Sequence, residues 1–207
     1  SPGFPEHPNE APAFPSHSPG FPDEKVHERG FTPGLPNSQH HAGASPAPAL
    51  QHGSPPPSGF RVPLTSGAPF PSPQQAGSPV AYDIDHSPIF LGSALFEKSV
   101  HPCKIAAALN PPCRVPYAGT EFEHHGRFDL LPFDPNTMEW LVTSHGRIPP
   151  GKRPVEGGYE EHGAKLYHAL AQVSGVEVPG KTGEHLGGCN VAFGGGEHVF
   201  RENYKIL

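Results

Sequence analysis

Two lysines and two glutamates recur at matching places in the C-terminal part of this 207-residue sequence. Lys104 and Lys181 each close a Pro-small-Lys triplet, and Glu121 and Glu197 each follow a run of small residues. An ammonium group donates hydrogen bonds and a carboxylate accepts them, so the two groups can form an ion pair or offer both roles to a polar ligand. A surface ion pair that fixes a turn contributes only about 0 to 1 kcal/mol. For Glu121 and Glu197 we expect a structural, supporting role in orienting the lysines.

The fifteen histidines raise the question of a metal site, which their spacing does not favour. None of those in the C-terminal part shows the ligand spacing of a zinc site: His124, His125, His162, His168, His185 and His198. We therefore expect packed or solvated histidines, with no metal and no cofactor. Cys189 near His185 lacks a third group that would orient a base, so no catalytic residue and no enzyme is predicted.

The three cysteines are an odd number, which argues against a closed disulfide framework. Cys113 and Cys189 occupy equivalent places of the recurring pattern. We interpret them as small buried apolar residues, in preference to a bridge or a reactive thiol.

The recurrence extends over the last two-thirds of the chain. Aligning Phe90 with Tyr167 brings the two lysines into register. Matching segments follow in the same order, first Cys113-Arg114-Val115-Pro116-Tyr117 with Cys189-Asn190-Val191-Ala192-Phe193, and then Phe128-Asp129-Leu130-Leu131 with Tyr204-Lys205-Ile206-Leu207. A repeat of this length indicates one structural unit used twice, so functional residues should lie at equivalent places.

The elements that must position these residues read as strands. From about residue 58, short aromatic and β-branched pieces are separated by glycine and proline, which is typical of strands and turns. The sequence predicts an all-β fold with repeat units at 58–131 and 138–207. Residues 1–57 are rich in proline, glycine, serine and histidine and lack long apolar runs, so we expect a disordered tail there.

Charge argues against a nucleic-acid ligand, and hydropathy argues against a membrane-spanning segment. The net charge is −6 and no basic stripe is present, so we expect no nucleic acid as a ligand. No apolar run is long enough to span a bilayer, so no transmembrane segment is expected. Because the sequence begins at Ser1, the lack of a signal peptide carries no information, and both a cytoplasmic and a secreted soluble protein remain open.

Several separately spaced motifs carry a resemblance to a known family. They run from Trp140 through Gly157-Gly158-Tyr159-Glu160, Pro179-Gly180-Lys181 and Phe193-Gly194-Gly195 to Tyr204 and Leu207. In this order they resemble the DM-nine repeat of natterin-like proteins and mannose-binding lectins. The match covers the second unit and the first from about Tyr82. It implies an all-β, pseudo-symmetric tandem repeat of two small twisted antiparallel sheets, here preceded by the Pro-rich tail.

The resemblance also implies a ligand and its contacts. In lectins of this family, an acid after the Gly-Tyr pair and the lysine of Pro-Gly-Lys contact mannose. Those positions are Glu160 and Lys181 in the second unit, and Asp83 and Lys104 in the first. The family acid is aspartate, so Glu160 is one methylene longer, and the first unit matches more loosely before Tyr82.

The chemistry of a sugar fits such a pair. A carboxylate can accept two hydroxyl protons while an ammonium group donates to hydroxyl oxygens. A shallow polar site competes with water, so we expect affinity on the order of millimolar to high micromolar. Two sites per chain, or a homodimer, would raise avidity for a mannose-type glycan. The alternative from another class is a protein-interaction or membrane-recruitment module without a sugar site.

Overall fold

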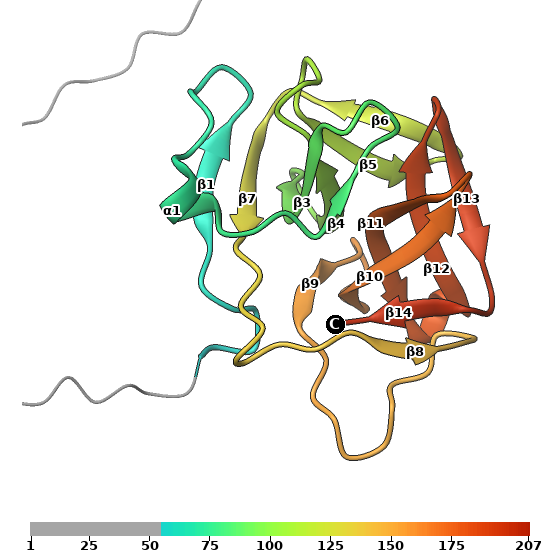
Figure 1. The fold of residues 1–207 in the computed structure, drawn as a ribbon. Coiled ribbons are helices and arrows are strands. Elements are labelled where there is room, and N and C mark those ends of the chain that lie inside the picture. Colours follow the sequence, from blue (N-terminus) through green and yellow to red (C-terminus); the bar gives the residue numbers. More distant parts are fainter. Residues whose placement is uncertain (1–54) are drawn as a thin grey trace, which may run out of the picture. The chain divides into compact units, whose positions relative to one another are not determined.

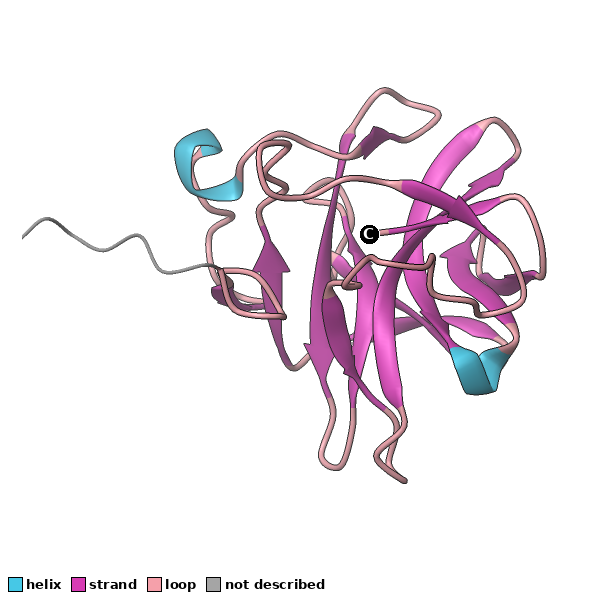
Figure 2. Ribbon diagram, turned by 90° about the horizontal axis from the view of Figure 1, so that it is seen from below, coloured by secondary structure: helices cyan, strands magenta, loops and turns pink. Residues whose placement is uncertain are grey.

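The all-β prediction is confirmed by the computed structural model, which describes residues 55–207. Strands dominate the described part of the chain, and its only helices are the short α1 (Pro73–Ala76) and the 3-10 turn η1 (Glu184–Leu186) (Figure 2). Except for its last three residues, the predicted disordered tail at 1–57 lies outside the described residues and stays a prediction.

Each half of the described chain contributes seven strands (Figure 1). Those of the first half are β1 (Val62–Thr65), β2 (Ala81–Tyr82), β3 (Pro88–Leu95), β4 (Val100–Ile105), β5 (Cys113–Tyr117), β6 (Thr120–His124) and β7 (Arg127–Leu131). Those of the second half are β8 (Leu141–Thr143), β9 (Glu156–Tyr159), β10 (Lys165–Val173), β11 (Val176–Gly183), β12 (Gly188–Phe193), β13 (Gly196–Phe200) and β14 (Tyr204–Ile206).

The two halves have the same strand order, arranged about a common junction. The sheet runs β1-β7-β3-β4-β5-β6 and continues β13-β12-β11-β10-β14-β8, so equivalent strands lie at equal distances from the β6–β13 junction. That junction is a single pairing of Thr120 with Gly196. The two small sheets expected from the sequence are thus hydrogen-bonded into one continuous antiparallel sheet. The registers also agree, because Lys104 lies opposite Leu91 and Arg114, and Lys181 lies opposite His168 and Asn190.

Short strands cross from each half to the other. Strand β9 pairs with β10 of its own half and also, through Tyr159 and Val100, with β4 of the first half. The close approach requires Gly158, whose φ is +152° and where a Cβ atom would lie 2.0 Å from the Val100 carbonyl oxygen. In the other direction, Ala81 and Ile89 pack into the core of the second half. Glu160, which directly follows β9, therefore lies beside the first half of the chain.

Two apolar clusters form the main core, one in each half. The first-half cluster includes Ile105, Val115, Phe128 and Leu130. The second-half cluster is made of these residues: Ala81, Ile89, Ala169, Ala171, Val173, Val176, Val178, Cys189, Val191 and Tyr204. Cys113 and Cys189 are buried and free, which confirms their interpretation as small apolar core residues.

Candidate binding site

The structure brings the two predicted residues of the second unit together. Glu160 follows β9 in a tight turn, in which its N–H donates to the Ala164 carbonyl and its own carbonyl accepts from Gly163. Lys181 lies in β11. The Glu160 Oε1 atom is 3.8 Å from Lys181 Nζ, which is an ion-pair distance but too long for a direct hydrogen bond.

Lys181 is buried against residues of the first unit. Its Nζ donates to Nδ1 of His101 at 3.2 Å and lies 5.6 Å from the centroid of the Tyr117 ring. Burial lowers the pKa of Lys181, while the Glu160 and Glu197 carboxylates act to raise it. Burial and the neighbouring ammonium also lower the pKa of His101 to about 4. His101 is therefore neutral near pH 7, and its Nε2–H donates to Ser99 Oγ at 3.0 Å.

The Glu160 carboxylate has cationic or polar neighbours on several sides and an open face. His185 Nε2 lies 3.6 Å from Oε1, and His101 Nε2 lies 3.9 Å from Oε2. None of the described residues donates a side-chain or backbone hydrogen bond to this carboxylate. The Glu160 side chain is 18% exposed and that of His185 is 29% exposed, so both reach solvent beside the buried Lys181. The carboxylate is thus free to accept hydrogen bonds from a ligand.

In the first unit, the predicted acid and lysine do not meet. Asp83 forms the same turn as Glu160, with its N–H donating to Ser87 and its carbonyl accepting from His86. Its Oδ1 accepts from the N–H of Ile84 at 2.7 Å, and no contact among the described residues joins it to Lys104. The buried Lys104 instead forms an ion pair with Glu121 at 2.7 Å.

The two supporting glutamates link the halves of the molecule. Glu121 Oε2 accepts from the N–H of Gly195 at 2.8 Å, and Glu197 Oε2 accepts from the N–H of Gly119 at 2.7 Å. Burial alone would raise the pKa of Glu121, but hydrogen bonds from Lys104 and Gly195 outweigh it and lower the pKa. Both carboxylates are therefore occupied, and each holds a turn of the opposite half.

Two differences between the units explain why only the second has an open carboxylate near its lysine. Asn190 occupies the place of Arg114 and donates to Glu197 Oε1 at 2.8 Å, so Glu197 makes no direct contact with Lys181. The register also places Val178 where the first half has His101. Each lysine faces the other half, since Lys104 Nζ lies 5.5 Å from the centroid of the Phe193 ring.

Sequence reasoning missed the contributions of the opposite unit. His101 and Tyr117 surround Lys181, but they stand 80 and 64 positions before it in the sequence, and no local motif connects them. His185 had one signal, because it has no histidine counterpart in the first unit. The described residues contain no group of three or more potential ligands suited to a metal ion. They also contain no helix long and apolar enough to cross a membrane.

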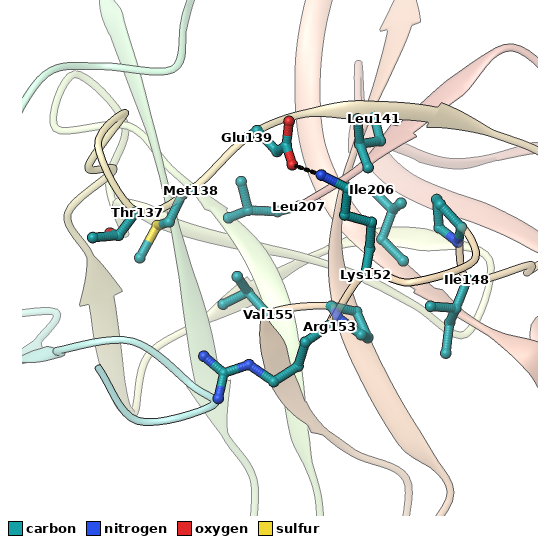
Figure 3. A pocket seen from close by; sticks show the side chains of 12 residues that line it. Thr137, Met138, Glu139, Leu141, Ile148, Lys152, Arg153, Val155, Ile206 and Leu207 are labelled. Carbon is teal, nitrogen blue, oxygen red and sulfur yellow. Dashed lines mark hydrogen bonds and ion pairs between the residues drawn. The ribbon is translucent and has the colours of Figure 1, made fainter. Parts of the chain in front are cut away.

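A small cavity elsewhere in the second half is lined by neither Glu160, Lys181 nor His185. It has a volume of about 90 Å³, and its lining includes Ile206, Leu207 and the Lys152–Glu139 ion pair (Figure 3). The predicted site residues therefore lie outside this cavity.

Comparison with known proteins identifies the repeat. The family model of the DM9 (DM-nine) repeat matches residues 83–200, which is more than half of the chain. The crystal structure of the nematode sperm cell motility protein MFP2B superimposes with a TM-score of 0.51 at 15% identity, covering 71% of this chain and 45% of that one. At this identity the likeness shows the fold alone, and the chain spans less than half the length of that protein. No curated protein matches the sequence.

Proposed function

Since the chain belongs to the DM9 repeat family, we propose that it is a lectin-like binding protein and not an enzyme. The proposed ligand is a mannose-type glycan, and the proposed site is formed by Glu160, Lys181 and His185. The sequence resemblance supplies the sugar class.

The proposal rests mainly on the open Glu160 carboxylate. Of the four acids singled out in the sequence, Glu121, Glu197 and Asp83 already accept hydrogen bonds from the protein. Glu160 accepts none from the described residues and lies 3.8 Å from Lys181. It is thus the acid among the four that can accept hydrogen bonds from two ligand hydroxyls while a lysine stands beside it.

The geometry favours weak, reversible binding. Lys181 is largely covered, so it acts mainly by holding positive charge behind the carboxylate, while Glu160 and His185 reach solvent. A hydroxyl pair that displaces water from such a rim gains few net contacts, and we expect a Kd on the order of a millimolar. Multivalent glycans would bind more tightly through repeated attachment.

Binding by the full chain to mannan-agarose, with elution by free mannose, tests the proposal. Glu160→Gln removes the charge at nearly constant shape and should weaken retention by about tenfold or more. The matched control is Asp83→Asn, at the equivalent turn of the first unit, which should leave retention within about twofold if one site operates. Equal loss in both variants would indicate that Asp83 also contributes to sugar binding and would refute a single site. Full retention of Glu160→Gln would refute the site.

A second candidate is a protein-interaction module without a sugar site. It is favoured by Tyr82 and Ile84, which are adjacent to the first-unit turn and are 57% and 68% exposed. MFP2B, which has a similar fold, is a sperm cell motility protein. If this candidate holds, the Glu160→Gln protein keeps its partner, and Ile84→Ser loses it.

A further inference from the structure

A cleft in the first half contains a second set of polar groups that the Glu160 site does not use. It has a volume of about 210 Å³ and is lined by β9 together with residues of the first half: Ser58, Arg61, Ser93, Val100, Asp129, Glu156, Gly157, Gly158 and Tyr159. Neither Glu160 nor Lys181 is among its lining residues.

Arg61 is a partly buried cation at this cleft. Its Nε donates to the Ser58 carbonyl at 2.7 Å, and one NH1 hydrogen goes to Ser93 Oγ at 2.9 Å. The NH2 group donates to the Glu156 carbonyl at 2.8 Å and to His168 Nε2 at 2.9 Å. A guanidinium group has five N–H donors, so one NH1 hydrogen has no acceptor among the described residues.

The charge of Arg61 is kept although no carboxylate pairs with it. Burial lowers its pKa to about 10, and His168 beside it is neutral because burial lowers the pKa of the imidazole well below its usual value. Arg61 is therefore still protonated near pH 7. Its positive charge therefore stands at the cleft, which Arg61 lines.

Asp129 supplies the complementary acceptor. Its side chain is 22% exposed, and its one ion-pair partner in the described residues is Arg127, at 3.4 Å, which is itself 59% exposed. Asp129 and Arg61 both line the cleft, yet they form no ion pair within 4.0 Å. Asp129 Oδ2 accepts no hydrogen bond from the described residues, so it can accept from one ligand hydroxyl while Arg61 donates to a neighbouring one.

Tyr159 adds an aromatic surface at the same cleft. Its side chain is 47% exposed even though its backbone pairs with Val100. Aromatic rings offer a flat apolar face, on which the C–H face of a sugar ring can rest while its hydroxyls reach polar partners.

The equivalent place in the second unit is closed. There, the register puts Lys205 in the place of Asp129 and Glu177 in the place of Val100, and these two side chains form an ion pair. Trp140 takes the place of Arg61. The spare donor of Arg61 and the second carboxylate oxygen of Asp129 are therefore found at one of the two equivalent places, and the repeat fold alone does not require them.

We propose that this cleft is a second binding site for one pyranose ring, whose hydroxyls bridge Arg61 and Asp129 and whose apolar face lies on Tyr159. The volume of about 210 Å³ is below the range of about 300 to 1,000 Å³ of drug-sized pockets, which suits a single sugar ring. The ligand class is that of the proposed function, but the residues are different, so each site can exist without the other.

Amide chemical-shift titration of the full chain with methyl α-mannopyranoside and methyl β-glucopyranoside tests the second site. In the Glu160→Gln protein, saturable shifts are expected at the amides of Ser93 and Asp129. Asp129→Asn and Tyr159→Ala should each weaken this binding by about tenfold or more. The matched control is Tyr82→Ala, which alters the equivalent exposed tyrosine of the first unit and should leave the binding unchanged.

The outcomes separate the two sites. Shifts confined to Lys181 and His185 would overturn the cleft proposal and support the Glu160 site. Shifts confined to Ser93 and Asp129 would support the cleft and refute the Glu160 site. Absence of saturable shifts at Ser93 and Asp129 with both glycosides, or equal weakening by Tyr82→Ala and Tyr159→Ala, would also overturn the second site. Thermal melts of the two variants within a few degrees of the parent exclude unfolding as the cause.

Discussion

The same chemical change at two glutamates should have very different effects on stability. Glu121→Gln and Glu160→Gln each replace a carboxylate with an amide of nearly equal shape. Glu121 is paired with buried Lys104 at 2.7 Å and also accepts from Gly195 at 2.8 Å. Glu160 is 3.8 Å from Lys181 and accepts no hydrogen bond from the described residues.

The distances and exposures set the magnitudes. At 2.7 Å and an effective dielectric constant of about 20, the gross attraction between Lys104 and Glu121 is about 6 kcal/mol. The side chains are 3% and 12% exposed, so removing one charge leaves the other with little water to solvate it. Loss of one partner of such a buried pair costs about 3 to 5 kcal/mol, and we expect about 3 for Glu121→Gln because the amide still accepts one hydrogen bond. For Glu160→Gln we expect about 1 kcal/mol or less.

Urea unfolding of the parent and both variants measures these costs. The midpoint should move much further for Glu121→Gln than for Glu160→Gln, with the m value unchanged, so that the difference reports stability alone. Lys104→Met in the Glu121→Gln background completes a double-mutant cycle and should recover part of the loss, since no unpaired charge then remains. Equal costs at Glu121 and Glu160 would refute the distinction between a structural and an open carboxylate.

Two further predictions concern His101 and Gly158. In the unfolded chain His101 titrates near its ordinary pKa of 6.5, whereas the folded pKa is about 4, so the folded state binds fewer protons between these values. The contribution of neutral His101 to the free energy of unfolding is therefore fully present above about pH 6.5, and about 3 kcal/mol of it should be lost as the pH drops to about 4. The urea midpoint should depend less steeply on pH in His101→Gln than in the parent. An unchanged slope would contradict the burial of a neutral ring. Gly158→Ala should cost several kcal/mol, because the new Cβ atom would lie 2.0 Å from the Val100 carbonyl oxygen. The control is Gly163→Ala, which is also at positive φ but has open space around it, and it should lower the free energy of unfolding by about 1 kcal/mol. Similar melting temperatures for the two variants would show that β9 does not need the close approach to Val100.

The sequence predicted the elements well because each unit carries its own local signals. Glycine and proline bound the strands, and the spacing that aligns Lys104 with Lys181 is kept in the strand registers. The turns at Glu160 and Asp83 use the same backbone hydrogen bonds, within five residues of the chain, so they too are local structure. These parts depend on residues close together in the chain, which is why patterns in the sequence contain them.

The surroundings of the lysines could not be predicted in the same way. The ring beside Lys181 belongs to Tyr117 and the ring beside Lys104 belongs to Phe193, so each lysine is covered by the opposite unit. This exchange arises from pairing between β4 and β9 and from the single β6–β13 pairing, which join distant parts of the chain. A repeat found in the sequence specifies which positions are equivalent, but it does not say which unit supplies the neighbours.

The exchange explains how two similar units acquired different chemistry while keeping one fold. In the first unit Arg114 forms an ion pair with Glu123, and Lys104 takes Glu121 as its buried partner. In the second unit Asn190 binds Glu197 instead, so Lys181 faces Glu160 and the neutral His101. The turn contacts of Glu121 and Glu197 persist in both units and hold the halves together. The changes from Arg114 to Asn190 and from His101 to Val178 at equivalent strand positions therefore distinguish the lysine closed in an ion pair from the lysine behind an open carboxylate.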